Sequence, residues 1–156
     1  MEITLKNIKV AKFMSEETTC FQAVVYVDGK KAGMAQNDGH GGSTYCHLDP
    51  VYHHLHNQKF NTPCYCNGKE NYCFMCKGTG TFEGSLDDYI DHIVETSQKE
   101  KERNAFTKKL LKNGMNYMIV AHGQYIGIKA TDEAQVRAYM AKKYPKQHIH
   151  EIIKVG

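Results

Sequence analysis

Residues 64–80 read CYCNGKENYCFMCKGTG and hold four cysteines, Cys64, Cys66, Cys73 and Cys76. Because the two close pairs are separated by six residues, four thiolates can surround one tetrahedral metal ion, and zinc is the usual occupant of an all-sulfur site. Glycine follows the first pair at 68 and the second pair at 78 and 80. Glycine lets the backbone fold back so that its amides point at the sulfurs. The stretch therefore predicts a Zn²⁺-binding knuckle that holds this part of the fold together.

The second pair resembles a known metal-binding unit. Residues 73–80, CFMCKGTG, are similar to the C-x-x-C-x-G-x-G unit of the cysteine-rich region of DnaJ proteins, which also occurs in anti-TRAP proteins. The first pair looks like a shorter copy, because it lacks one spacer residue and the final glycine. The resemblance covers about 17 residues and implies a zinc knuckle, not a chaperone. It leaves open that a histidine replaces Cys64 or Cys66 as a ligand.

Free cysteines, or two disulfides of a secreted protein, are the alternatives to a metal. The chain opens with MEITLKNIKV, which is polar and strand-like and has no apolar signal segment, so we expect a reducing cytoplasm, where disulfides are rare. Cys20 begins an apolar run and is most simply a small buried residue. Cys46 lies beside His47. Zinc is the interpretation that these features favour for the four clustered cysteines.

Four histidines follow Cys46 closely, at His47, His53, His54 and His56. His53 and His56 are three residues apart and would share one face of a helix, a spacing that can ligate a metal. A polar helix face is the simpler explanation. A second metal site, or a catalytic site that uses these imidazoles, is the alternative.

The length of 156 residues fits one compact domain with a metal-stabilised insertion, and 41% hydrophobic residues supply a core. No apolar stretch is long enough to span a membrane. Charge is distributed unevenly, since residues 98–156 carry twelve Lys and Arg against five acidic residues, hence +7. A basic third of this kind is a possible contact for nucleic acid, although a solvated helix face is more common.

Hydrophobic patterns predict an α+β fold, mostly antiparallel sheet with packed helices. An N-terminal β-rich part with a short helix (1–60) precedes the knuckle (61–84), and a long helix and a β-β-α-β series follow (85–156). The expected strands are 2–12, 20–27, 30–36, 43–48, 117–121, 125–129 and 148–155. Asp28-Gly29 predicts a hairpin turn. Helices are expected over 51–59, capped by Asp49, and after a Thr131 cap to just before Pro145.

The longest helix is predicted to begin at Ser85, with Asp88 completing a partial capping box, and to end at Asn113-Gly114. Its apolar stripe disappears between 97 and 104. Either one helix of nearly thirty residues projects from the body, or two helices meet near Lys101. An apolar stripe at the two ends alone favours projection, or burial against a partner chain, so a homo-oligomer is possible.

The loop Asn37-Asp38-Gly39-His40-Gly41-Gly42 carries the clearest functional hypothesis outside the cysteines. Its backbone N–H groups can cradle an anion, and Asn37, Asp38 and His40 can orient a ligand or exchange a proton. A wide hairpin loop, built from residues that tolerate left-handed conformations, is the simpler explanation. The longer stretch 15–42 resembles small uncharacterised proteins of bacteriophages and mobile elements, which implies an accessory role in a bacterial cell.

Two classes of function fit these observations. The first is a zinc-stabilised, non-catalytic binding protein that regulates or inhibits a host system by docking on a protein or nucleic-acid partner, with Tyr65, Tyr72, Phe74 and Met75 either exposed for contact or packed inward. A four-thiolate site leaves no open position for water and favours this class. The second is a metal-assisted hydrolase or nucleotide-processing enzyme that uses the Asp38/His40 loop with the nearby histidines.

Overall fold

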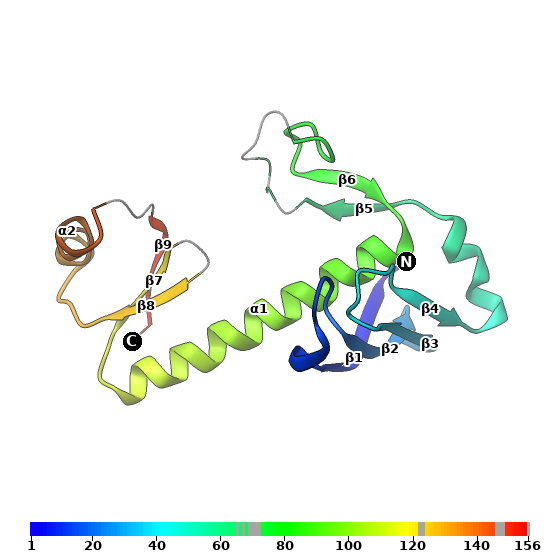
Figure 1. Cartoon of the computed structure of the whole chain (residues 1–156), viewed down its shortest axis with the longest axis horizontal. Coiled ribbons are helices and arrows are strands. Elements are labelled where there is room, and N and C mark those ends of the chain that lie inside the picture. The colour runs from blue at the N-terminus through cyan, green and yellow to red at the C-terminus, as the bar shows by residue number, and fades with distance from the viewer. Residues whose placement is uncertain (65, 67, 69–72, 122–123, 146–148, 156) are drawn as a thin grey trace. The chain divides into compact units, whose positions relative to one another are not determined.

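The computed structural model describes residues 1–64, 66, 68, 73–121, 124–145 and 149–155. The chain divides into two compact units, Met1–Ser97 and Gln98–Gly156. Helices and antiparallel strands make up both units, which confirms the predicted α+β fold (Figure 1). The long helix α1 (Leu86–Lys112) supplies residues to both units. None of the described helices combines the length and the apolar character needed to cross a bilayer.

The first unit is built on a four-stranded antiparallel sheet of order β1-β2-β3-β4. Its strands confirm those predicted from the sequence and are β1 (Ile3–Val10), β2 (Phe21–Val27), β3 (Lys30–Asn37) and β4 (Tyr45–Leu48). Asp28 and Gly29 join β2 to β3 with φ of 47° and 77°. Two successive left-handed residues are what a tight hairpin turn requires, so the Asp-Gly signal was read correctly.

One face of this sheet packs into the core of the first unit. Alternate residues of β2 are buried, from Phe21 to Val27, and they belong to the same cluster as Leu86, Ile90 and Val94 of α1. A period of two in the strand and of three to four in the helix gives each element one apolar face. Full burial of one such side chain stabilises the fold by about 1.5–3 kcal/mol.

The segment between β4 and the knuckle differs from the prediction in its helix type. Pro50–Asn57 is a 3-10 helix (η2), not an α-helix over 51–59. Asp49 is its N-cap but makes no side-chain capping bond; instead its carbonyl accepts the N–H of Tyr52 at 2.8 Å. Leu55 is the buried residue of this segment, so a longer α-helix would gain little stability from tertiary packing. The histidines of the segment are also weak helix formers. A second short 3-10 helix, η1 (Lys12–Met14), follows β1.

The knuckle is inserted between two paired strands, β5 (Phe60–Pro63) and β6 (Thr81–Gly84). After β6 the chain enters α1 through the predicted capping box. Ser85 N–H donates to Asp88 Oδ2 at 2.7 Å, and Asp88 N–H donates to Ser85 Oγ at 3.2 Å. The two residues thus satisfy each other's backbone donors at the start of the helix.

Replacing Ser85 with alanine is expected to lower the free energy of unfolding by about 1 kcal/mol, because the hydroxyl that accepts the Asp88 N–H is lost. Equilibrium urea unfolding of the zinc-loaded chain measures the difference. Thr96→Ala, an exposed hydroxyl further along the same helix, is the matched control and should change stability by less than about 0.5 kcal/mol. Equal losses in both variants would contradict a capping role.

Helix α1 is continuous through the region where its apolar stripe is lost. Residues 99–105 are all exposed, whereas Leu110 near the C-terminal end is buried. The stripe is interrupted between two apolar ends: Leu86, Ile90 and Val94 belong to the core of the first unit, and Leu110 packs against Gly127 of the second. Gly114 ends the helix in a left-handed conformation, with φ of 67°, as the Asn-Gly signal predicted.

The second unit contains a three-stranded antiparallel sheet of order β8-β7-β9 and one further helix. Its elements are β7 (Tyr117–Ala121), β8 (Gln124–Ile128), α2 (Glu133–Lys143) and β9 (Ile149–Lys154). Asp132, and not the predicted Thr131, caps α2, because Asp132 Oδ1 accepts the N–H of Gln135 at 2.8 Å. Buried Ile119, Val136 and Met140 form part of the core of this unit, separate from the core of the first.

Candidate metal centre and the 37–42 loop

The structure brings the four predicted ligands together in one cluster. The Sγ atoms of Cys64 and Cys73 lie 3.6 Å apart, those of Cys64 and Cys66 also 3.6 Å, and those of Cys66 and Cys76 3.2 Å. All four Sγ atoms lie within 4.8 Å of one another. A tetrahedral site with metal–sulfur bonds of about 2.3 Å has sulfurs about 3.8 Å apart, so this cluster can close around one metal ion.

The cysteines of the chain are free thiols, so the disulfide alternative is wrong. A disulfide needs its sulfurs about 2.05 Å apart, far closer than any separation in the cluster. Cys64 and Cys76 are buried, and Cys66 and Cys73 are half-buried. Partial burial keeps water away from the sulfurs and is typical of a site that stabilises a fold.

Short-range backbone bonds position the two halves of the cluster. Cys64 directly follows β5, and its N–H donates to the carbonyl of Gly80 at 2.7 Å, which ties the first pair to the start of β6. The second pair is folded into a turn in which the Lys77 N–H donates to the Cys73 carbonyl at 2.8 Å. Gly78 and Gly80 have φ of 86° and 82°. These left-handed glycines allow the chain to curl around the Cys76 sulfur.

The electrostatics of the cluster favour a thiolate at Cys76. The pKa of Cys76 is lowered to about 6, chiefly by a hydrogen bond from Cys66 and then by the backbone N–H groups of Gly80 and Gly78, which together outweigh the opposing effect of burial. The backbone N–H of Cys66 acts to lower the pKa of Cys64, but burial and hydrogen bonds with the other three thiols raise it to about 12. Thiolates are the metal-binding form, and backbone donors beside a sulfur help to hold its charge.

The knuckle also exposes apolar side chains. Phe74 is 96% exposed and Met75 is 46% exposed, next to the predicted ligands Cys73 and Cys76. These two residues therefore point outward and do not pack into the knuckle, so of the two predicted alternatives the exposed one is confirmed for them. Tyr65 and Tyr72 lie outside the described residues.

The histidines near Cys46 do not add a second cluster. Cys46 is buried whereas His47 is exposed, because successive strand residues point to opposite faces of β4. The ring of His53 lies 2.9 Å from the Leu48 carbonyl oxygen, and that of His54 lies 3.1 Å from the Val51 carbonyl oxygen. Over the described part of the chain, the four cysteines are the one group of three or more potential ligand residues close enough to hold a metal.

The predicted ligand loop is organised by Asn37. The Asn37 side chain is buried; its Oδ1 accepts the Thr18 hydroxyl at 2.8 Å and the Gly39 N–H at 2.9 Å. Its Nδ2 donates to the Gly42 carbonyl at 3.0 Å and to Thr44 Oγ1 at 3.2 Å. These four hydrogen bonds tie the Asn37 side chain to the residues of its own loop and to Thr18. Asn37 therefore has a structural role.

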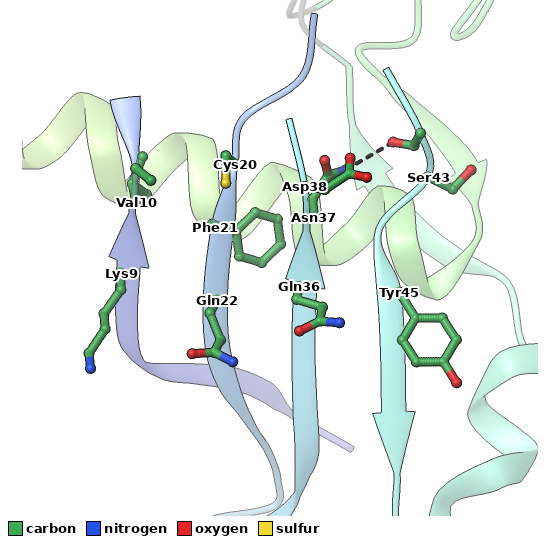
Figure 2. Close-up of a pocket in the computed structure, with 12 residues that line it drawn as sticks. Lys9, Val10, Cys20, Phe21, Gln22, Gln36, Asn37, Asp38, Ser43 and Tyr45 are labelled. Atoms are coloured by element: carbon green, nitrogen blue, oxygen red, sulfur yellow. Dashed lines mark hydrogen bonds between the residues drawn. The ribbon is translucent and has the colours of Figure 1, made fainter. Parts of the chain in front are cut away.

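Asp38 and His40 have different surroundings. Asp38 Oδ1 accepts the N–H of His40 at 3.1 Å, and Asp38 lines a cavity of about 530 Å³ together with Asn37 (Figure 2). The exposed ring of His40 is turned to Glu16, with Nδ1 3.1 Å from Glu16 Oε2. His40 is not among the residues that line the cavity. The loop thus separates the acid from the imidazole that the catalytic hypothesis combines.

One polar contact could not be predicted from the sequence: the Thr44 hydroxyl donates to Asp91 of α1. Burial raises the pKa of Asp91, the hydrogen bond from Thr44 opposes this, and the nearby carboxylates of Asp87, Asp88 and Glu95 raise the pKa further. The partners are 47 residues apart in the chain, so no local pattern could have paired them.

Because folded Asp91 keeps its proton to higher pH than the unfolded carboxyl, its contribution favours folding at low pH. That contribution is lost as the pH rises from about 4 through the folded-state pKa. The asparagine side chain of the Asp91→Asn variant is neutral at every pH. The free energy of unfolding of this variant, minus that of wild type, is therefore expected to increase from pH 4.5 to pH 7.5. Urea unfolding of both proteins across this range checks the sign. A difference that does not vary with pH would contradict the shifted pKa.

No protein-family model matches the chain, and no curated protein or solved structure matches it. The likeness to DnaJ-type knuckles therefore rests on residues 73–80 and on the clustering of the four sulfurs alone.

Proposed function

We propose that the chain is a zinc-stabilised binding protein, without catalysis of its own, that docks on a protein partner. The observation that supports this most is the closed set of four cysteine sulfurs, all within 4.8 Å of one another. Four thiolates fill the coordination sphere of Zn²⁺ and leave no position for a reacting water, which is the arrangement of structural zinc sites.

The exposed residues of the knuckle support a docking role. Phe74 and Met75 project beside two of the ligands, so zinc binding fixes the backbone that presents them. Aromatic residues and methionine are enriched in protein interfaces. A cytoplasmic accessory role in a bacterial cell, for a bacteriophage or mobile element, follows from the resemblance of residues 15–42 and completes the proposal.

Native mass spectrometry of the full-length, untagged chain tests the metal and records the assembly state in the same spectra. One zinc per chain, removed by chelator only together with unfolding of the 61–84 segment, is the expected result. Two metals per chain, one of them removed without unfolding, would instead point to the histidines and to metal-assisted catalysis. No bound metal would overturn the proposal.

The docking surface is tested by comparing wild type with a Phe74→Asp, Met75→Asp double variant in affinity capture from bacterial lysate, followed by binding measurements with the purified partner. We expect a partner that binds wild type with a defined stoichiometry and is lost in the variant. Zinc content must be equal in both proteins, because loss of zinc would itself disrupt the surface. Unchanged binding by the variant would exclude the knuckle as the docking surface.

A further inference from the structure

The outward face of the β1–β4 sheet carries a row of side chains that the proposed function does not use. The strand register pairs Lys9 with Gln22, Gln22 with Gln36, and Gln36 with Tyr45, so each strand contributes one residue. Figure 2 shows these four side chains across the sheet. All four are exposed, and Tyr45 keeps 62% of its surface accessible. The row therefore offers an amine, two amides and a phenol ring to a ligand.

The neighbouring positions extend this surface along the strands. The next row pairs Lys6 with Val24, Val24 with Met34, and Met34 with His47. Met34 is 40% exposed. Beyond it Tyr26 pairs with Lys31, and Lys6 Nζ lies 4.2 Å from the centre of the Tyr26 ring. The face is thus a broad sheet surface that combines amines, rings and amides with the apolar side chains of Val24 and Met34.

Charge is segregated onto this face. Residues 1–63 contain six lysines and six acidic residues and are all described, so the segment has no net charge. Lys6, Lys9 and Lys31 lie at outward-facing strand positions, whereas none of the six carboxylates does. Three amines and no carboxylate at the strand positions give the sheet face a positive potential, although the segment that forms it is neutral and Asp38 lines the cavity at its end.

The cavity of about 530 Å³ lies at the end of this face where Lys9 and Tyr45 are located. Gln22 and Gln36 also line it, and Asp38 is the one carboxylate among its lining residues, with Oδ1 accepting the His40 N–H. A volume in this range is typical of small-molecule sites. It can accept a planar ring beside Tyr45, with amide donors and acceptors at its edge.

We propose that the outward face of the β1–β4 sheet binds single-stranded nucleic acid. One base stacks on Tyr45 within the cavity and hydrogen-bonds through its edge to Gln22 and Gln36, while Lys6, Lys9 and Lys31 contact phosphates. Exposed aromatic rings on a sheet, flanked by basic side chains, are the features that bind unpaired bases. Protein interfaces are depleted in lysine, so three lysines across the face favour nucleic acid over a protein partner. The site is distinct from the knuckle and goes beyond the proposed function.

Fluorescence anisotropy of the zinc-loaded full chain with a fluorescein-labelled dT12 oligonucleotide tests the proposal. Tyr45→Ala is expected to weaken binding by about tenfold, because the stacking of one base on the ring is lost. The triple variant Lys6→Gln, Lys9→Gln, Lys31→Gln should reduce the slope of log affinity against log salt by about 2, because each phosphate contact to a single strand contributes about 0.7. A duplex of the same length should bind more weakly than the single strand.

Three matched variants serve as controls. Lys59→Gln removes an exposed lysine off the sheet, Phe74→Ala removes an exposed ring in the knuckle, and Lys108→Gln, Lys109→Gln, Lys112→Gln removes three amines from the basic third. All three should bind dT12 within about twofold of wild type, and zinc content and circular dichroism should match in every protein. Wild-type affinity in Tyr45→Ala overturns the proposal. So does loss of binding confined to the triple variant on α1, or no dT12 binding at 50 mM salt. A purified protein that binds this face in place of dT12 overturns it as well.

Discussion

Cys76→Ser is expected to weaken zinc binding by a few hundredfold and to unfold the knuckle. Structural zinc sites contribute about 10–16 kcal/mol of apparent binding free energy, so one ligand of four accounts for about 2.5–4 kcal/mol. Cys76 is the strongest choice because its sulfur is buried and its charge is held by the Gly78 and Gly80 amides. Competition with a chromophoric chelator measures the affinity at pH 7.

The matched control for this experiment is Cys20→Ser, because Cys20 is also a buried free thiol but lies outside the cluster. It should keep wild-type zinc affinity and lose only a small amount of stability. If Cys76→Ser holds zinc as tightly as wild type, Cys76 is not a ligand. If Cys20→Ser weakens zinc binding equally, the loss reflects general destabilisation and not ligation.

The unfolding caused by Cys76→Ser should also be local. The two units have separate hydrophobic cores, one of which includes Phe60 and Leu86 and the other Ile119 and Val136. Hydrogen exchange is therefore expected to lose protection in β5 and β6, which enclose the knuckle, and to keep it in β7. Equal loss of protection in β7 would show that zinc stabilises both units.

Features of the fold that depend on neighbours in the chain were predictable. The hairpin at Asp28-Gly29, the capping box of Ser85 and Asp88 and the end of α1 at Gly114 each follow from one local conformation or one reciprocal pair of bonds. The cysteine cluster was predictable for the same reason. Its spacing and its glycines encode the turns that bring the sulfurs together.

The errors arose where tertiary packing decides between similar local structures. An amphipathic pattern over 51–59 fits an α-helix or a 3-10 helix, and with Leu55 as its buried residue the segment became a 3-10 helix. Thr131 and Asp132 are both good caps, and the backbone geometry at Asp132 decided the choice.

Contacts between distant segments carried no sequence signal at all. The Thr44–Asp91 bond, and the row from Lys9 to Tyr45 that the register aligns, exist only once the sheet and the helix are in place. Residues 38–42 were correctly predicted as a loop, whereas Asn37 is the last residue of β3. The pattern of Asn, Asp, His and Gly could not distinguish ligand binding from structural bonding, because those residue types serve both purposes.

Asn37→Ala separates these two interpretations of the loop and is expected to lower the free energy of unfolding by about 3 kcal/mol. The substitution removes four hydrogen bonds: the Gly39 N–H loses its acceptor, the Gly42 carbonyl loses a donor, and Thr44 Oγ1 loses a donor while keeping its bond to Asp91. Buried polar groups left unsatisfied cost about 1–3 kcal/mol each. Urea unfolding of the zinc-saturated chain, with the denaturant dependence compared between proteins, measures the change.

His40→Ala is the matched substitution in the same loop, and it should change stability by less than about 0.5 kcal/mol, because the exposed His40 ring pairs with the exposed Glu16. A loop that depends on Asn37 for stability and tolerates loss of His40 is built to hold the ends of β3 and β4. Wild-type stability in Asn37→Ala would refute that structural role. If His40→Ala folds normally but loses a measured ligand or activity, the catalytic alternative becomes the better explanation of this loop.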